Sequence, residues 1–123
     1  MLNSYAAIDV ETASPVALVA RLYAAAIRHT RAARDAGDDA RTRGRSASRA
    51  LEILGELRQS LSMEQGGEIA RNLDALYEFT SDRIVDGTRG RRGAFDEALR
   101  VLELLGEAWD EVARGPAAAA AEA

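Results

Sequence analysis

The chain has 123 residues, no cysteine, and 20 acidic against 16 basic residues, which gives a formal net charge of −4. A chain of this length is typical of one domain that buries a core without cross-links, and the lack of cysteine excludes disulfides and zinc–cysteine sites. The acidic balance argues against nucleic acid as a partner. No apolar run approaches the ~18 residues of a spanning helix, and the first residues lack a signal-peptide pattern. We therefore expect no membrane insertion and a cytoplasmic location.

The first half of the sequence predicts an extended arm followed by two helices. Residues 1–14 have no helical periodicity, and Ser14-Pro15 combines a preferred N-cap with proline at the first helical position. Apolar residues then recur three and four apart from about residue 15 to 36, which is the pattern of an amphipathic helix. After a polar connection, a second run with the same spacing covers about 42–61 and forms a heptad-like seam.

The second half predicts two more helices, separated by turn sequences. The stretch 62–67 breaks the second helix, and a third apolar stripe, which begins at Ile69, follows over about 67–85. A loop rich in glycine and arginine covers 86–93, and the fourth helix covers about 94–113, with a core stripe that ends at Val112, before Gly115-Pro116 stops it. The alanine-rich end of the chain has no large side chain to pack, so we expect it to be disordered.

Four amphipathic helices of ~20 residues, each about 30 Å long, favour an all-α fold, an antiparallel four-helix bundle. No alternating β-period competes with the helical pattern. We therefore divide the chain into an N-terminal arm at 1–14, a helical bundle domain at 15–114 and a disordered tail at 115–123.

Two of the predicted helices carry wider apolar arcs than one core needs. On the fourth helix, Val101, Leu104 and Ala108 extend the main stripe onto a neighbouring flank, giving an arc of about 220° against the roughly 100° typical of a surface helix. The first helix has an arc of about 180° between Leu18 and Ile27. This extra apolar surface fits a well-buried helix, the interface of a homodimer, or a groove that accepts another amphipathic helix. The periodicity alone does not decide between these interpretations.

The sequence contains no recognisable catalytic, cofactor or metal site. Its single histidine, His29, lies among arginines near the end of the first helix, where we expect a surface residue. There is no Glu-x-x-His pair for a di-iron site, no nucleophile turn, and no phosphate-loop ending in the segment 86–93. Asn72 is either an edge amide facing water or a hydrogen-bonding group for a bound chain. We therefore expect a binding protein rather than an enzyme, with no metal and no cofactor.

Three blocks of the sequence resemble a known family, the flagellar secretion chaperones called FliS. The first runs from Tyr5 to Tyr23 and includes Thr-Ala-Ser-Pro followed by Leu-Val-x-x-Leu-Tyr. The second runs from Glu64 to Phe79 and contains Gly-Gly-Glu-Ile-Ala-x-Asn-Leu and then Leu-Tyr, which is the most specific of the three. The third is Ala-Trp at 108–109. The blocks follow the family's order and spacing over nearly the whole domain.

The resemblance implies a cytosolic helical bundle that binds the C-terminal segment of newly made flagellin. Such a protein keeps flagellin from polymerising prematurely and helps deliver it to components of the flagellar export apparatus. The alternative, from a different class, is a structural or self-associating helical bundle without a flagellin client, and a homodimer is compatible with either.

The expected client-binding residues come from the arm, the matched positions of the first and third helices, and the surplus flank of the fourth. They are Tyr5, Ile8, Val10, Leu22, Tyr23, Asn72, Leu73, Leu76, Tyr77, Val101, Leu104 and Ala108. The apolar arm residues would lose the benefit of burial if they stayed in water. We expect the arm to fold back over the client surface as a removable cover. The alternatives are that it packs permanently beside the site, forms part of it, or stays flexible.

Overall fold

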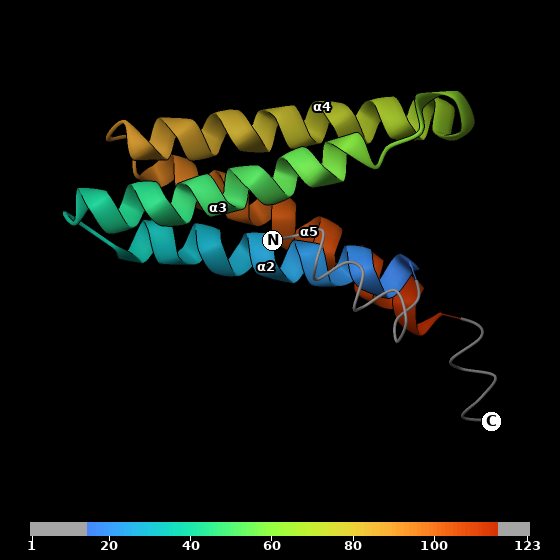
Figure 1. Cartoon of the computed structure of the whole chain (residues 1–123), viewed down its shortest axis with the longest axis horizontal. Coiled ribbons are helices and arrows are strands. Elements are labelled where there is room, and N and C mark those ends of the chain that lie inside the picture. Colours follow the sequence, from blue (N-terminus) through green and yellow to red (C-terminus); the bar gives the residue numbers. More distant parts are fainter. Residues whose placement is uncertain (1–14, 116–123) are drawn as a thin grey trace.

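The computed structural model describes residues 15–115, which form four α-helices and, within that range, no strand. In chain order they are α2 (Pro15–Asp35), α3 (Ala40–Gln59), α4 (Met63–Thr88) and α5 (Gly93–Arg114) (Figure 1). The predicted all-α, four-helix bundle is confirmed, and each predicted helix overlaps one observed helix. The predicted arm and residues 116–123 of the predicted tail lie outside the described residues.

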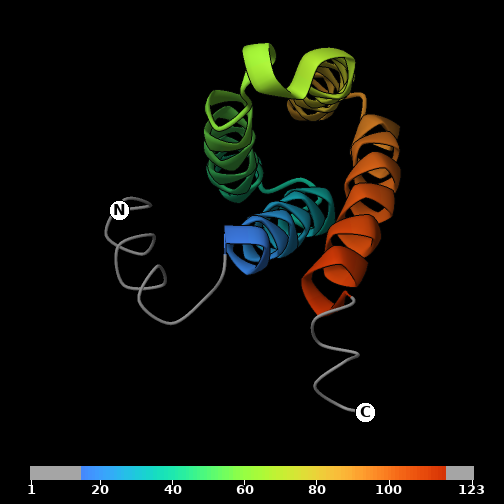
Figure 2. The ribbon, with the colours of Figure 1, turned by 90° about the vertical axis from the view of Figure 1, so that its right-hand side faces the viewer.

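The four helices surround one core, and each packs along two others. α2 packs along both α3 and α5, and α4 closes the far side by packing on the same two helices. α3 and α5 do not contact each other, and α2 meets α4 only briefly, so each of these pairs lies across a diagonal of the bundle. Figure 2 shows this order from one end of the molecule. The outer faces of α3 and α5 therefore point to opposite sides.

Local sequence explains where the helices begin. Asp39 caps α3 by accepting a hydrogen bond at Oδ1 from the backbone N–H of Thr42 at 3.1 Å. The Ser62 hydroxyl caps α4 in the same way, accepting from the N–H of Gln65 at 3.3 Å. These caps satisfy N–H groups that the first turn of a helix leaves without partners. Pro15 begins α2 as predicted, since its missing N–H and fixed φ suit the first helical position.

α4 begins earlier than the sequence predicts. A break is expected over 62–67, but residues 63–66 form a helical turn and the non-helical backbone is confined to Gly67. Gly67 has φ 55° and ψ −128°, a conformation that other L residues rarely adopt. A Cβ on Gly66 would lie 2.7 Å from the Cβ of Ala70. The two glycines thus let the first turn kink and pack closely on the body of α4.

The core has three aromatic side chains among its largest buried groups. Tyr23, Tyr77 and Phe95 are fully buried, surrounded by alanine, leucine and isoleucine from all four helices. Thr30 and Thr80 are the buried polar residues of the described range, and each donates its hydroxyl to the carbonyl oxygen four residues earlier at 2.7 Å. The buried hydroxyls are therefore satisfied, as a stable apolar core requires.

Two glycines in helices test how closely this core is packed. A Cβ on Gly87 would lie 2.6 Å from the buried ring of Phe95, whereas a Cβ on Gly55 meets nothing within 4 Å. We expect Gly87→Ala to destabilise the protein by about 1–3 kcal/mol through overpacking. The matched Gly55→Ala should stabilise it by roughly 0.5–1 kcal/mol through helix propensity. Urea unfolding followed by circular dichroism measures both, and equal effects would contradict the packing described.

Candidate functional site

Most of the large apolar side chains that remain exposed gather on α4 and α5. The described residues expose Met63, Ile69, Leu76 and Phe79 on α4, and Leu104 and Val112 on α5. Their exposed fractions range from 37% for Leu76 to 72% for Ile69. Neither α2 nor α3 exposes a large apolar residue. These exposed side chains are gathered on two adjacent helices, which makes the two helices the candidate interaction surface.

We call this surface the α4–α5 apolar face and define it by the residues that helical spacing places on one side of each helix. On α4 these follow at intervals of seven and three, and on α5 at intervals of three or four. They are Ile69, Leu76 and Phe79 on α4, and Val101, Leu104, Ala108 and Val112 on α5. Val101 is half-buried, and the other six are exposed.

An ion pair sets the register between the two helices. The Arg83 guanidinium on α4 lies 3.7 Å from the Glu97 carboxylate on α5. Leu76 precedes Arg83 by seven residues and Leu104 follows Glu97 by seven. Because the helices are antiparallel and rise about 1.5 Å per residue, both leucines lie about 10 Å from this ion pair, at the same level. The two strips of apolar side chains therefore run alongside each other.

Arg83 closes one end of the face. Its guanidinium lies 5.5 Å from the centroid of the Phe79 ring, within the range of a cation–π contact. It also pairs with Asp86 at 2.6 Å. Within the described residues, its Nε is buried without a hydrogen-bond partner. The face thus has a fixed, charged boundary near the α4–α5 loop.

The face opens toward its other end. Figure 2 shows that α5 leans away from α4 as it approaches its C-terminal end. Ile69 lies in the early turns of α4 and Val112 in the last turn of α5, which is the end of the face away from Arg83. Both side chains are more than half exposed. Charged residues of both signs are exposed near this end, among them Glu68 and Arg71 on α4 and Glu111 on α5. The surface is therefore apolar along its length and bordered by charges of both signs.

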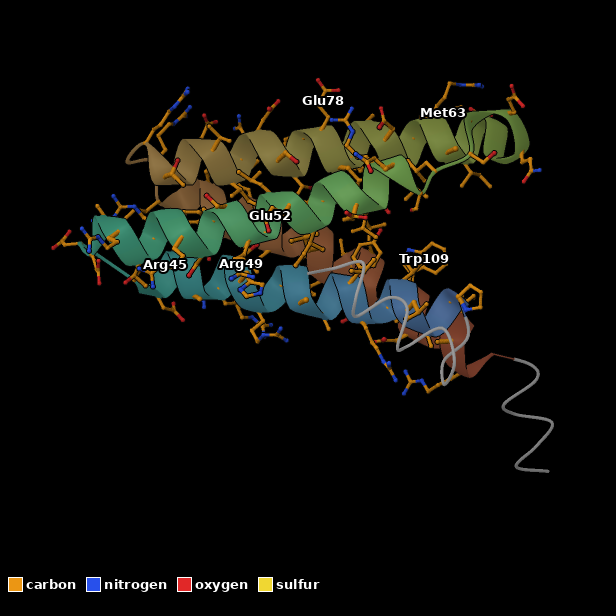
Figure 3. The ribbon with its side chains drawn as sticks, viewed as in Figure 1. Arg45, Arg49, Glu52, Met63, Glu78 and Trp109 are labelled. Atoms are coloured by element: carbon orange, nitrogen blue, oxygen red, sulfur yellow. The ribbon has the colours of Figure 1, made fainter. Side chains whose placement is uncertain are left out.

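Below the face, an aromatic cluster links three helices. The hydroxyls of Tyr23 on α2 and Tyr77 on α4 are hydrogen-bonded, with ring centroids 6.2 Å apart. The Tyr23 ring stacks on Trp109 of α5 at 6.4 Å, and Figure 3 shows Trp109 reaching from α5 toward the α2 side. Burial, and next the hydrogen bond with Tyr77, raises the pKa of Tyr23 far above its usual value. Burial likewise raises the pKa of Tyr77.

The structure sorts the expected client-binding residues into three groups. Leu76, Leu104 and Ala108 are exposed on the α4–α5 apolar face, Val101 is half-buried within it, and Asn72 is exposed on the same side of α4. Leu22 and Leu73 are half-buried against the core, while Tyr23 and Tyr77 are core residues that present no surface to a partner. Tyr5, Ile8 and Val10 lie outside the described residues.

Three residues of the face were not among those expected. The sequence places Ile69 and Val112 in core-facing stripes, and this is wrong, since 72% of Ile69 and 58% of Val112 are exposed. Phe79 was named only as the last residue of the block from Glu64 that resembles the FliS family. A signal was present in the spacing of 69, 76 and 79, which puts these residues on a different side of α4 from Tyr77. His29, expected at the surface, is half-buried.

The described part of the chain contains no group of three or more histidine, aspartate or glutamate side chains arranged to hold a metal ion. None of its helices is both long and apolar enough to cross a membrane.

Comparison with known proteins identifies the family. The family model described as "Flagellar protein FliS" matches residues 1–116. The chain is 33% identical over 119 residues to the flagellar secretion chaperone FliS of Vibrio cholerae, covering 90% of this chain and 87% of that protein. It is 31% identical over 120 residues to the protein of the same name from Salmonella typhimurium, covering 90% and 88%. A shorter match, 38% identical over 65 residues and 52% of each chain, is to the flagellar secretion chaperone FliSB of Pseudomonas aeruginosa. The chain belongs to the FliS family.

The buried tyrosine pair predicts a loss of stability at alkaline pH. A tyrosine in the unfolded chain ionises near pH 10, whereas the pKa values of Tyr23 and Tyr77 are raised in the folded protein. A raised pKa gives stability that is fully present below the unfolded pKa and is lost as the pH rises through it. The free energy of unfolding should therefore be level up to about pH 9 and fall above about pH 10.

A Tyr5→Phe background leaves only the two buried tyrosines to titrate. In that background, we expect no phenolate absorbance before the helices unfold, and the additional changes Tyr23→Phe and Tyr77→Phe should flatten the alkaline decline. Phenolate absorbance that rises near pH 10 while the circular dichroism stays native would show that the pair is accessible to solvent.

Proposed function

We propose that this protein is a flagellar export chaperone that binds the C-terminal segment of flagellin on the α4–α5 apolar face. The observation that carries the proposal is the row of exposed apolar side chains on two adjacent antiparallel helices, in a chain of the FliS family. The relatives from Vibrio cholerae and Salmonella typhimurium are both named flagellar secretion chaperones. An exposed surface of this kind fits a chaperone better than an enzyme, since it binds chains without needing reactive groups.

The shape of the face favours an amphipathic helix as the bound form of the client. Two parallel strips of apolar side chains can receive residues spaced three and four apart on a third helix. Exposed charges of both signs, such as Glu68, Arg100 and Glu111, would then lie beside the client's flanks. A client with both acidic and basic residues next to its apolar stripe would complement these charges.

The energetics suit a client that is disordered when free. Each large apolar side chain buried by the client contributes roughly 1.5–3 kcal/mol. Ordering the client's backbone costs about 1–2 kcal/mol per residue. A segment that folds on binding therefore needs a long contact, and the net affinity stays moderate enough for release. Covering the segment in this way would keep it from polymerising in the cytoplasm before it reaches components of the flagellar export apparatus.

Leu104 offers the sharpest test of the site, because 69% of its side chain is exposed near the middle of the α5 strip. Leu104→Asp should weaken binding of a flagellin C-terminal peptide at least ~10-fold, since a charge would replace a buried side chain worth about 1.5–3 kcal/mol. Isothermal titration calorimetry measures the affinity, and circular dichroism should show an unchanged helical signal.

Ser48→Asp is the matched control, since it adds the same charge at an exposed position on α3, across the bundle. The control should bind the peptide as the unmodified protein does. Loss of binding in both variants, or unfolding of Leu104→Asp, would contradict the assigned surface.

We also propose that the arm at 1–14 covers this face when no client is bound. The support comes from the sequence, where Tyr5, Ile8 and Val10 are apolar and lie ahead of Pro15, which begins α2. Ordering the arm costs roughly 1–2 kcal/mol per residue, so a larger client can displace it. Deleting residues 2–10 should leave flagellin binding equal or tighter and make the free protein aggregate more. Abolished binding in a folded deletion variant would instead make the arm part of the client site.

A self-associating bundle is the second candidate function, because the same apolar face would also suit a second copy of the chain. Size-exclusion chromatography with light scattering separates the two. A chaperone gives a stoichiometric complex when mixed with a flagellin C-terminal peptide. A purely self-associating bundle gives a homodimer that the peptide leaves unchanged.

A further inference from the structure

Arginine is concentrated in one stretch of this acidic chain. Residues 28–49 carry seven of the sixteen arginines and three of the twenty acidic residues. The stretch covers the second half of α2, the connecting loop and the first half of α3. In a protein with a net charge of −4, this places a positively charged region on two packed helices.

The three acidic residues of this stretch are already engaged. Asp35 pairs with Arg34 at 2.9 Å, Asp38 pairs with Arg92, and Asp39 caps α3 through Thr42. Asp39 also lies close enough to Arg45 for its charge to be felt, but none of the three forms an ion pair with Arg28, Arg41, Arg45 or Arg49.

Three of the seven arginines also have structural partners. Arg31 pairs with Glu103 at 2.7 Å, Arg34 reaches Asp96 as well as Asp35, and Arg43 donates to the carbonyl oxygen of Gly37 at 2.6 Å. The other four, Arg28, Arg41, Arg45 and Arg49, are exposed and form no ion pair with any residue between 15 and 115.

The four unpaired arginines lie on one surface. Arg41, Arg45 and Arg49 follow at intervals of four, so they share one side of α3 over about 12 Å. Arg28 is exposed on α2, which packs along α3. The charges of both Arg28 and Arg49 act on His29: after burial, they are the causes that lower the pKa of His29. Figure 3 shows Arg45, Arg49 and Glu52 on the side of α3 that faces the viewer. We call the surface formed by Arg28, Arg41, Arg45 and Arg49 the arginine face.

This arrangement works against folding, because like charges four residues apart destabilise a helix. Glu52 is an exposed carboxylate one turn beyond Arg49 on α3, and it forms no ion pair with the four arginines within the described residues. A partner that supplies carboxylates would relieve the repulsion. Arginine is suited to this, since its guanidinium forms paired hydrogen bonds with a carboxylate.

The surroundings of the arginine face decide between kinds of anionic partner. A helix that lies on a membrane needs large apolar side chains beside its charges, and α2 and α3 expose none. Binding of single-stranded nucleic acid needs aromatic rings on which bases stack, and no aromatic side chain is exposed on these helices. We infer that the arginine face docks an acidic protein surface, with carboxylates spaced along a helix or loop to meet Arg41, Arg45 and Arg49.

The arginine face and the α4–α5 apolar face lie on different sides of the bundle. The arginine face is built mainly on α3, which does not contact α5. In Figure 1, α3 and α2 lie toward the viewer and α5 lies behind them. A docked acidic partner therefore leaves the apolar face free, and the inference holds whatever the client is.

The test uses the full chain and poly-L-glutamate as a probe rich in carboxylates. Fluorescence anisotropy at low salt measures its association with the unmodified protein and with a variant that combines Arg41→Gln, Arg45→Gln and Arg49→Gln. Glutamine favours the helix, and circular dichroism verifies that the fold is kept. We expect the association constant to fall about 10-fold in this variant, and the salt dependence of binding to weaken.

A matched control carries Arg71→Gln, Arg100→Gln and Arg114→Gln, three exposed arginines on α4 and α5. It has the same net charge as the first variant, so it should change the association constant less than about 2-fold if position decides binding. Equal losses in both variants, or no binding of poly-L-glutamate, would overturn the inference. Sedimentation with phosphatidylcholine vesicles containing phosphatidylglycerol, lost only in the first variant, would make a membrane the partner and would also overturn it.

Discussion

The hydrogen bond between the hydroxyls of Tyr23 and Tyr77 fixes the arrangement on which the rest of the molecule depends. α2 and α4 lie across a diagonal and touch only briefly, so this hydrogen bond links directly two helices that otherwise meet mainly through α3 and α5. Each hydroxyl satisfies the other inside the core, where an unpaired one would cost about 1–3 kcal/mol. Because Tyr77 points inward toward Tyr23, the rotation of α4 about its axis is set, and Leu76 and Phe79 must point outward. The exposed strip on α4 is therefore a consequence of how the core is closed.

The same constraint divides the surface into two chemically different sides. α5 packs on α4 near the Arg83–Glu97 ion pair and then leans away, which leaves apolar side chains uncovered on both helices. On the other side, α3 carries Arg41, Arg45 and Arg49, which form no ion pair with a carboxylate between residues 15 and 115. An apolar strip suits a chain that folds as it binds, whereas unpaired arginines suit a faster, salt-dependent contact. One small bundle can thus hold a client and meet a second protein at separate places.

The sequence predicts the helices well, because apolar spacing, caps and glycines act locally. Pro15 begins α2, and the four predicted helices coincide with the observed ones to within a few residues. The extension of α4 back to Met63 was missed, since it depends on the unusual backbone of Gly67.

The sequence predicted some of the residues that the α4–α5 apolar face exposes. A wide apolar arc on the fourth helix pointed to Leu104 and Ala108, which are exposed, yet Ile69 and Val112 were placed in the core. The width of an apolar arc shows how much apolar surface a helix carries. Which part of that surface the rest of the bundle covers depends on where α4 and α5 separate. The proximity of Arg28 to the arginines of α3 likewise cannot be predicted from the sequence, because it depends on how α2 and α3 pack together.

Amide hydrogen exchange on the complex with a flagellin C-terminal segment tests the central claim most directly. Exchange reports the local opening of each part of the bundle, so a client that covers the α4–α5 apolar face should slow it in the turns of α4 around Ile69, Leu76 and Phe79 and in the turns of α5 around Leu104. The outer turns of α3 around Arg45 should exchange as in the free protein. Protection confined to α3, or a complex that forms with no change on α4 and α5, would contradict the account.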